Sequence, residues 1–509
     1  MICGRDLGLN HENQMKINRI AILGGGSAGL LAALTLRKQL PEMPVEVIYS
    51  EDLGVIGVGE GTTAAFPRHL FEYLKLDPAT FYREAEPTWK LGIHFKWGPY
   101  PQGFYYSFQS EYKSKWPELS RNAGFYCEPE TGWMGMVSAC MAQGRVFPRR
   151  PDGSPHFHKG HAFHIENKKL VGYLEGQCRK LGVKFTEGKV SQVERGGEGV
   201  AAMVLESGER IVADLYVDAS GFRSELLGRA MGEAYVSFER SLFCDRAVIA
   251  GWPRGDEPLL PHTVAETMDA GWCWQIEHEH WINRGYVYAS RFISDEDALA
   301  EFRRKNPRIA NEPRVVRFRS GRYRRHWVGN VVGVGNAVGF VEPLEATALQ
   351  VICLESSTLA DAIKDSLGDP PPSLVELYNQ YNTRQWEDIR DFLAVHYAFN
   401  RRVDTPFWRA CREETELGGA EAFVRFYEEN GPSAIADAVL FDPNNSFGLE
   451  GYLAMLVGQG VPHAKPWVAP PGERRVWVER LKHYGEHAAR GYTVQACLDL
   501  IRQGKIKLG

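Results

Sequence analysis

The chain has 509 residues, of which 44% are hydrophobic and 24% are charged, the composition of an ordinary globular protein. Its length predicts roughly three domain-sized units. Its net charge of −5 excludes the strongly basic face expected of a nucleic-acid-binding protein, so we expect a small-molecule partner.

The cysteine pattern and the N-terminus bear on location. Nine cysteines are scattered singly, without a CxxC pair, which favours a reducing compartment. There is no apolar run of about 18 residues, and the first residues lack the apolar core of a signal peptide. We therefore expect a cytoplasmic protein without a membrane segment. Residues 1–15 are predicted to be a disordered leader, with Met15 as an alternative start.

The stretch from residue 19 to 51 predicts a β-α-β unit that binds a dinucleotide. Ile20 to Leu23 form a short apolar strand, and GGGSAG then leads into a helix, so that GxGxxG stands at the strand-to-helix turn. The glycines permit a tight turn and close approach of a pyrophosphate, and the helix N-terminus offers free amides. A second strand, Val45 to Tyr49, ends about 20 residues further on near an acid that can bind ribose. The predicted ligands are Gly24, Gly26, Ser27, Ala28, Gly29 and Glu51.

Beyond this unit the pattern alternates between loops, helices and strands. Residues 50–63 are glycine-rich and predict a loop over the nucleotide site. A helix is expected at about 66–76, and Trp89 to Trp97 alternates as one strand that carries Lys90. Residues 100–163 show no periodicity. A helix is predicted at 169–180, followed by a strand, a hairpin and a last strand that ends at Asp218. After these we expect a strand at 246–251 and an antiparallel pair of strands at 271–280 and 284–292. A strand at 327–334 and a helix from Thr347 complete the predicted elements.

The glycine-rich stretch VGVGNAVG, residues 332–339, lies between a predicted strand and a predicted helix, and such a late second contact suits FAD folds better than NAD folds. No second complete fingerprint follows, so we expect no NAD(P)H domain. Prolines 370–372 predict a linker, after which helix formers dominate. We expect an α/β, FAD-binding Rossmann-type fold of the flavin monooxygenase (GR2-like) kind with an added β-sheet. Residues 16–370 would form its core, and residues 371–509 a mainly helical module that covers the substrate site.

From about Lys16 to Trp408 the chain resembles the flavin-dependent halogenases of the tryptophan-halogenase family. The motifs that carry the resemblance, in this order, are GGGSAG, GVGEGTT, WKLGIHF, DASGFRS, GWCWQIE, GYVYAS, GFVEPLEATAL, and HY with DTPFW. The resemblance implies an enzyme that uses reduced FAD, O2 and a halide ion to make hypohalous acid, which halogenates a small aromatic substrate. A separate NAD(P)H flavin reductase would supply the reduced flavin.

The resemblance also implies roles for single residues. Lys90 would receive the hypohalous acid, either as a hydrogen-bonding ammonium or as an amine that becomes a haloamine, and Glu345 would take the proton from the arenium intermediate. Trp272 and Trp274 would keep the substrate away from the flavin. The remaining implied contacts are Val190, Asn336 and Leu349 to FAD, and the amides of Thr347 and Ala348 to the halide.

Three departures from the family pattern matter for function. Glu277 stands where the tryptophan motif ends in proline, and Ala348 stands where glycine is frequent. Residues 435–449 contain no tyrosine, so the family's anchors for the free amino acid are missing. We therefore expect an electron-rich arene such as free indole. The alternatives are an aromatic hydroxylase on the same fold and a flavin-binding protein without turnover, while bromide versus chloride, and monomer versus homodimer, stay open.

Overall fold

The computed structural model describes most of the chain. The described residues are 16–53, 59–109, 111, 118–120, 124, 126–127, 130, 132–157, 160–197, 199–433, 435–442, 444–465 and 468–506. The predicted leader, with Met15, lies outside them, as do residues 54–58 of the predicted loop over the nucleotide site. Among the described residues, no helix is long and apolar enough to cross a membrane.

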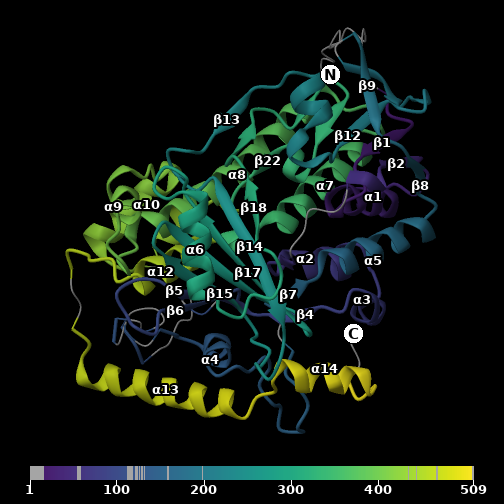
Figure 1. Cartoon of the computed structure of the whole chain (residues 1–509). Coiled ribbons are helices and arrows are strands. Elements are labelled where there is room, and N and C mark those ends of the chain that lie inside the picture. The colour runs from purple at the N-terminus through teal and green to yellow at the C-terminus, as the bar shows by residue number, and fades with distance from the viewer. Residues whose placement is uncertain are drawn as a thin grey trace, which may run out of the picture.

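The nucleotide-binding sheet has six strands in the order β20 (Trp327–Val328), β21 (Val331–Gly333), β12 (Leu215–Asp218), β1 (Ile20–Leu23), β2 (Val45–Tyr49) and β8 (Lys184–Glu187). All pairs are parallel except β20 with β21. Helix α1 (Ser27–Gln39) connects β1 to β2 and packs against α5 (Asn167–Lys180) and α7 (Ala348–Asp365), as Figure 1 shows. The predicted β-α-β unit is confirmed. The single strand predicted at 327–334 is wrong, because the chain turns back at Gly329 and pairs Trp327 with Val332.

A second sheet of seven strands stands beside the first. Its order is β18 (Arg314–Arg317), β14 (Arg246–Pro253), β17 (Trp281–Tyr288), β16 (Gly271–Glu277), β15 (Thr263–Met268), β5 (Gly92–Lys96) and β6 (Phe104–Ser107). The pairing of β16 with β17 confirms the antiparallel pair predicted at 271–280 and 284–292, although the second strand begins and ends a few residues earlier. A small sheet of β3 (Glu60–Gly61), β7 (Ala162–Ile165) and β4 (Thr88–Lys90) lies against it.

The strand predicted from Trp89 to Trp97 is two strands in two sheets. Leu91 separates β4 from β5, and its amide donates to the carbonyl of Pro261 while its carbonyl accepts from the amide of Phe108. Lys90 therefore ends one strand at the junction of two sheets. The helix predicted at 66–76 is a short α2 (Ala65–Pro67) that continues as one π-helical turn, Arg68–Tyr73.

The remaining elements complete the core and cover it. Two further sheets are β11 (Arg210–Ile211), β10 (Gly199–Leu205) and β9 (Val190–Gly196), and β13 (Tyr235–Ser237), β19 (Gly321–Tyr323) and β22 (Gly339–Phe340). The other helices before residue 370 are α3 (Pro78–Glu84), α4 (Met136–Ala142) and α6 (Asp295–Lys305).

The C-terminal region is mainly helical, as predicted. Its helices are α8 (Pro372–Phe399), α9 (Pro406–Glu414), α10 (Glu421–Asn430), α11 (Ala436–Val439), α12 (Gly448–Gly458), α13 (Pro471–Ala489) and α14 (Val494–Arg502). Pro372 occupies the first turn of α8, where its missing N–H costs no helical hydrogen bond. Helix α8 packs against α7, and α13 runs beneath α4 in Figure 1. The domain boundary at residue 370 stays a prediction.

Candidate active site

The turn after β1 has the geometry of a dinucleotide cradle. Gly24 has φ 131°, and a Cβ atom on Gly29 would lie 1.9 Å from the carbonyl oxygen of Gly24, so both positions require glycine. Gly26 is the N-cap of α1 and has open space where a side chain would stand. No side chain caps this helix, so its first amides are free to bind a pyrophosphate. The turn therefore fits the phosphates of FAD.

The other residues predicted to bind FAD are spread over several elements. Glu51 is exposed in a 3₁₀ turn directly after β2, and Val190 begins β9. Asn336 is exposed in the 3₁₀ turn Gly335–Ala337 and lines a cavity described below. Leu349 is buried in α7 and does not line that cavity. The FAD contacts of these residues stay predictions.

One cavity connects the region of Asn336 to Lys90. It encloses about 180 Å³ and is lined mainly by apolar atoms. Its walls come from the loop before β3, from the second sheet and from the turn that precedes α7. Among the lining residues are Gly61, Lys90, Trp274, Asn336, Ala346, Thr347 and Ala348.

Lys90 is fully buried at the end of β4. Its Nζ has no hydrogen-bond partner in the part of the chain that the structure describes, and it lies 5.0 Å from the centre of the Phe108 ring. Gly61 leaves room for it, since a Cβ atom there would stand 3.2 Å from Nζ. Burial lowers the pKa of Lys90 to about 7, an effect that the nearby Glu345 opposes. Near neutral pH the amine is therefore available in both protonation states.

Glu345 ends the 3₁₀ turn Pro343–Glu345 and is buried. Its Oε1 lies 2.8 Å from Nε2 of His396, whereas its Oε2 is buried without a partner among the described residues. Burial raises the pKa of Glu345, and His396 and Lys90 lower it. The Glu345 carboxylate therefore interacts electrostatically with the Lys90 amine, and its Oε2 makes no hydrogen bond among the described residues. Glu345 itself is not one of the cavity-lining residues, although Pro343 and Ala346 on either side of it are.

The start of α7 suits a small anion. Ala346 has a left-handed backbone with φ 55°, which turns the chain from the 3₁₀ turn into the helix. Thr347 is the N-cap and supplies no side-chain cap, so the first amides of α7 have no intrahelical partner. Ala348 is exposed to the cavity. Halide binding here stays a prediction that the geometry fits.

Trp272 and Trp274 lie on the same face of β16, with ring centres 6.0 Å apart. Trp274 lines the cavity, and it pairs across the hairpin with Gly285, where a Cβ atom would stand 1.9 Å from the indole ring. Trp272 lies deeper and donates its indole N–H to Glu342 at 3.5 Å. Sequence reasoning assigned no role to Gly285 or Glu342, although both belong to motifs that it used.

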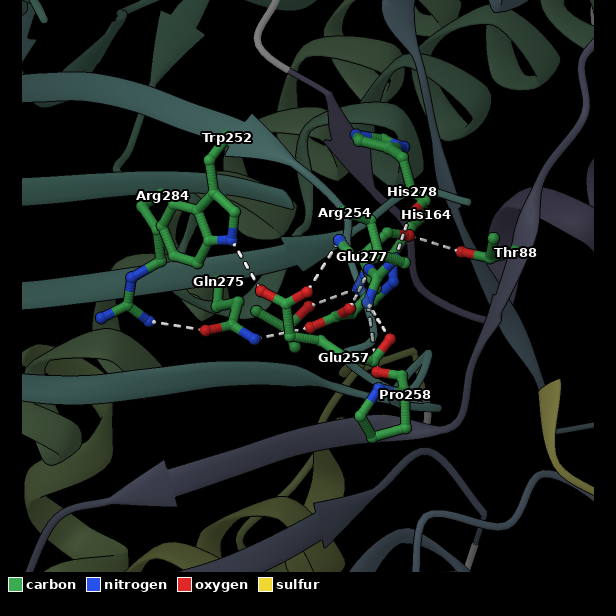
Figure 2. Close-up of polar contacts among 12 residues, drawn as sticks. Thr88, His164, Trp252, Arg254, Glu257, Pro258, Gln275, Glu277, His278 and Arg284 are labelled. Carbon is green, nitrogen blue, oxygen red and sulfur yellow. Dashed lines mark hydrogen bonds and ion pairs between the residues drawn. The ribbon is translucent and has the colours of Figure 1, made fainter. Parts of the chain in front are cut away.

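Glu277, the residue in place of the family's proline, is fully buried in a polar network (Figure 2). Its carboxylate forms an ion pair with Arg254 and accepts from the Gln275 amide at 2.6 Å. Its backbone carbonyl accepts from the hydroxyl of Thr88 at 2.6 Å. Strand β16 stays regular through Glu277, and the Thr88 contact ties it to β4 two residues before Lys90. Because that contact uses a backbone carbonyl, what the glutamate side chain adds is the bonds to Arg254 and Gln275. No local pattern marked Arg254, since it lies 23 residues from its partner.

Comparisons with known proteins identify the family of the chain. The family described as tryptophan halogenase matches residues 19–470. The tryptophan 7-halogenase RebH of Lentzea aerocolonigenes is 31% identical over 490 residues, covering 88% of this chain and 90% of that protein. The tryptophan 6-halogenase ThaL of Streptomyces albogriseolus is 32% identical over 427 residues, covering 78% and 79%.

Solved structures give the same result. MibH, a lathipeptide tryptophan 5-halogenase, superposes with a TM-score of 0.86 at 36% identity and covers 96% of this chain and 95% of its own. BrvH, a flavin-dependent halogenase from Brevundimonas sp. BAL3, superposes with a TM-score of 0.81 at 26% identity, covering 96% and 99%. The predicted resemblance and the predicted fold are therefore confirmed, and the chain belongs to the tryptophan halogenase family of flavin-dependent halogenases.

Proposed function

We propose that this protein is a two-component halogenase that uses FADH2 and O2 to brominate or chlorinate a small electron-rich arene, free indole or a simple indole derivative. The observation that carries the proposal is a cavity that Asn336, Lys90 and the start of α7 all line. Bound between the α1 turn and this cavity, reduced FAD would supply, with O2 and halide, the oxidising equivalent of hypohalous acid. A separate NAD(P)H flavin reductase would be needed because the sequence has one dinucleotide fingerprint only.

Lys90 and Trp274, which line the cavity, together with Glu345 next to the lining residue Ala346, account for the transfer of the halogen to the arene. As an ammonium, Lys90 donates a hydrogen bond to the oxygen of hypohalous acid and makes its halogen more electrophilic; as a neutral amine it would form a haloamine. Glu345 then accepts the proton from the halogenated ring carbon, which restores aromaticity. Trp274 stands in the cavity wall, where it would keep the arene from the flavin.

The proposal of an uncharged substrate rests on the stretch from Ile435 to Leu449. It contains no tyrosine to anchor the ammonium and carboxylate of a free amino acid. Phe447 instead stacks on Phe392 of α8, with ring centres 3.9 Å apart. An indole held by apolar contacts alone would react at its most nucleophilic carbon, C3.

A second candidate substrate is tryptophan within a peptide. MibH, at 36% identity over nearly the whole chain, is described as a lathipeptide tryptophan 5-halogenase. In a peptide the α-amino and α-carboxyl groups are amides, so that such a substrate also needs no ionic anchors. The absence of tyrosine from residues 435–449 is therefore compatible with both substrates.

The test is one assay with several substrates. The full chain is mixed with FAD, a flavin reductase, NADH, O2 and either bromide or chloride, and is given indole, free tryptophan or a tryptophan-containing peptide. We expect a halogen isotope pattern in the mass spectrum of the indole product, and its loss in Lys90→Ala while flavin oxidation continues. A gain of one oxygen independent of halide would instead identify a hydroxylase, and no product at all would identify a flavin-binding protein without turnover.

A further inference from the structure

His396 is the buried partner of Glu345, and its hydrogen bonds restrict where protons can be. It lies on α8 with no exposed surface. Its Nδ1 is 2.7 Å from the carbonyl oxygen of Phe392, one helical turn earlier, and its Nε2 is 2.8 Å from Oε1 of Glu345. Since a carbonyl oxygen can only accept, Nδ1 must carry a hydrogen. The contact between Nε2 and Oε1 therefore holds one further proton, which belongs either to an imidazolium or to a carboxylic acid.

We propose that His396 is a positioning residue that holds this proton, so that Glu345 stays ionised and its Oε2 is available to accept the proton of the arene. This inference rests on the proposed halogenase function and assigns to that reaction a residue for which the motifs gave no role. The two oxygens of Glu345 have different contacts. Oε1 is hydrogen-bonded to His396, whereas Oε2 is buried without a partner among the described residues, so Oε2 is the oxygen that we assign to the proton of the arene.

The surroundings make such a partner necessary. The titratable groups that act on Glu345 are His396 on α8 and Lys90 on β4. The rings packed around His396 are Phe95, Trp97 and Phe392, which are uncharged and exclude water. Burial alone favours the protonated form of a carboxyl group, and a protonated Glu345 could not act as a base. An imidazolium at 2.8 Å lowers the pKa of Glu345 and so opposes the effect of burial, as Lys90 also does.

The proton balance closes without a further reactant. Lys90 gives a proton to the hydroxide that leaves hypohalous acid, which becomes water, and the ring carbon gains the halogen. The C–H bond at that carbon then breaks, its electron pair returns to the ring, and the proton moves to Oε2 of Glu345. From Glu345 the proton returns to Lys90. His396 keeps its own proton throughout, so the net reaction converts arene and hypohalous acid to haloarene and water.

The experiment uses the full chain with FAD, reductase and bromide, and compares indole with indole deuterated at the carbon that the wild type halogenates. In the wild type we expect indole and deuterated indole to be halogenated at equal rates, because addition of the halogen to the ring, and not loss of the proton, is the rate-limiting step. In His396→Gln we expect the halogenation rate to fall about 10²-fold, a deuterium isotope effect to appear, and the acidic limb of the pH–rate profile to move to higher pH. Flavin oxidation should be unchanged. His396→Asn should behave in the same way if His396→Gln does not fold.

The matched control is His69→Gln, which replaces another buried histidine whose Nε2 lies 2.9 Å from the hydroxyl of Thr35. It should change neither the isotope effect nor the acidic limb of the pH–rate profile.

An independent measurement comes from ¹⁵N spectra of the flavin-free protein, where the His396 resonances should be those of an imidazolium and should become those of a neutral ring in Glu345→Gln. A neutral ring in the wild type, or a rate loss in His396→Gln without an isotope effect, would overturn the inference. Absence of halogenated product from the wild type would refute the proposed function itself, and this inference with it.

Discussion

Replacement of Lys90 by methionine tests how much the burial of its amine reduces the stability of the folded protein, separately from the role of the amine in catalysis. Methionine has a similar length and no charge, and it would occupy the same buried position. Lys90 has no exposed surface and its Nζ has no hydrogen-bond partner in the described structure. Folding therefore removes this ammonium from water without giving it a polar contact, and we expect the variant to be more stable than the wild type.

The size of the effect follows from the pKa of Lys90, which burial lowers from 10.5 to about 7. This difference corresponds to a destabilisation of the wild type of about 4 kcal/mol at pH 7 and about 5 kcal/mol well below it. Between pH 7 and 10.5 the unfolded chain binds the proton more tightly than the folded protein, so wild-type stability rises with pH in this window. The advantage of Lys90→Met should therefore be largest below pH 7 and disappear as the pH approaches 10.5.

The assay is urea denaturation of the flavin-free proteins at several pH values from 6.5 to about 10.5, a range that spans both protonation states. The control is Lys482→Met, which removes a lysine whose side chain is 76% exposed and should leave the midpoint and its pH dependence nearly unchanged. If Lys90→Met and the wild type gave parallel stability curves with the same midpoints, the amine would not be desolvated. The reasoning about its two protonation states near neutral pH would then fail.

Three further single variants and one double variant test other parts of the site. Glu345→Gln keeps the shape of the side chain but removes the base, so product formation measured by mass spectrometry should fall about 10²- to 10⁴-fold while flavin oxidation continues; a wild-type yield would contradict the assigned role. Gly29→Ala would place a Cβ atom 1.9 Å from the Gly24 oxygen and should abolish FAD binding in a fluorescence titration, whereas unchanged affinity would exclude the cradle. Arg254→Met removes the positive charge that pairs with the buried Glu277, leaves the Gln275 hydrogen bond to its carboxylate, and should cost about 3–5 kcal/mol in denaturation. Adding Glu277→Leu should restore most of that loss, and no recovery would show that the ion pair is not the cause.

The parts of the fold that could be predicted are those with local signals. The β-α-β unit is encoded within residues 20–49 by an apolar run, a glycine turn and a second apolar run. The hairpin of β16 and β17 is likewise local, because its strands are separated by three residues. In both cases the pattern and the pairing lie within one short stretch of chain.

The errors arose where distant segments decide the structure. Trp89 to Trp97 alternates as one strand, but Leu91 bonds to Pro261 and so divides it between two sheets. Residues 100–163 contain β6, α4 and β7, which are held by partners elsewhere in the chain rather than by their own periodicity.

The same reason explains what was missed in the site. The motifs placed Lys90 and Glu345 in one site, and in the structure the two lie close enough that Glu345 raises the pKa of Lys90 against the effect of burial. His396, however, lies 51 residues from Glu345, and only the path of α8 past the 3₁₀ turn brings the two side chains together. A hydrogen bond of this kind leaves no spacing in the sequence from which it could be predicted.

The most direct measurement is the amount of halogenated arene formed per flavin oxidised, in the wild type and in Lys90→Met. We predict that the wild type yields halogenated product and that the variant oxidises the flavin at the same rate but yields none. Because the variant is expected to be the more stable of the two proteins, unfolding could not explain the loss. A variant that gave the same product, at the same ring position and in the same yield, would contradict the transfer of the halogen through Lys90.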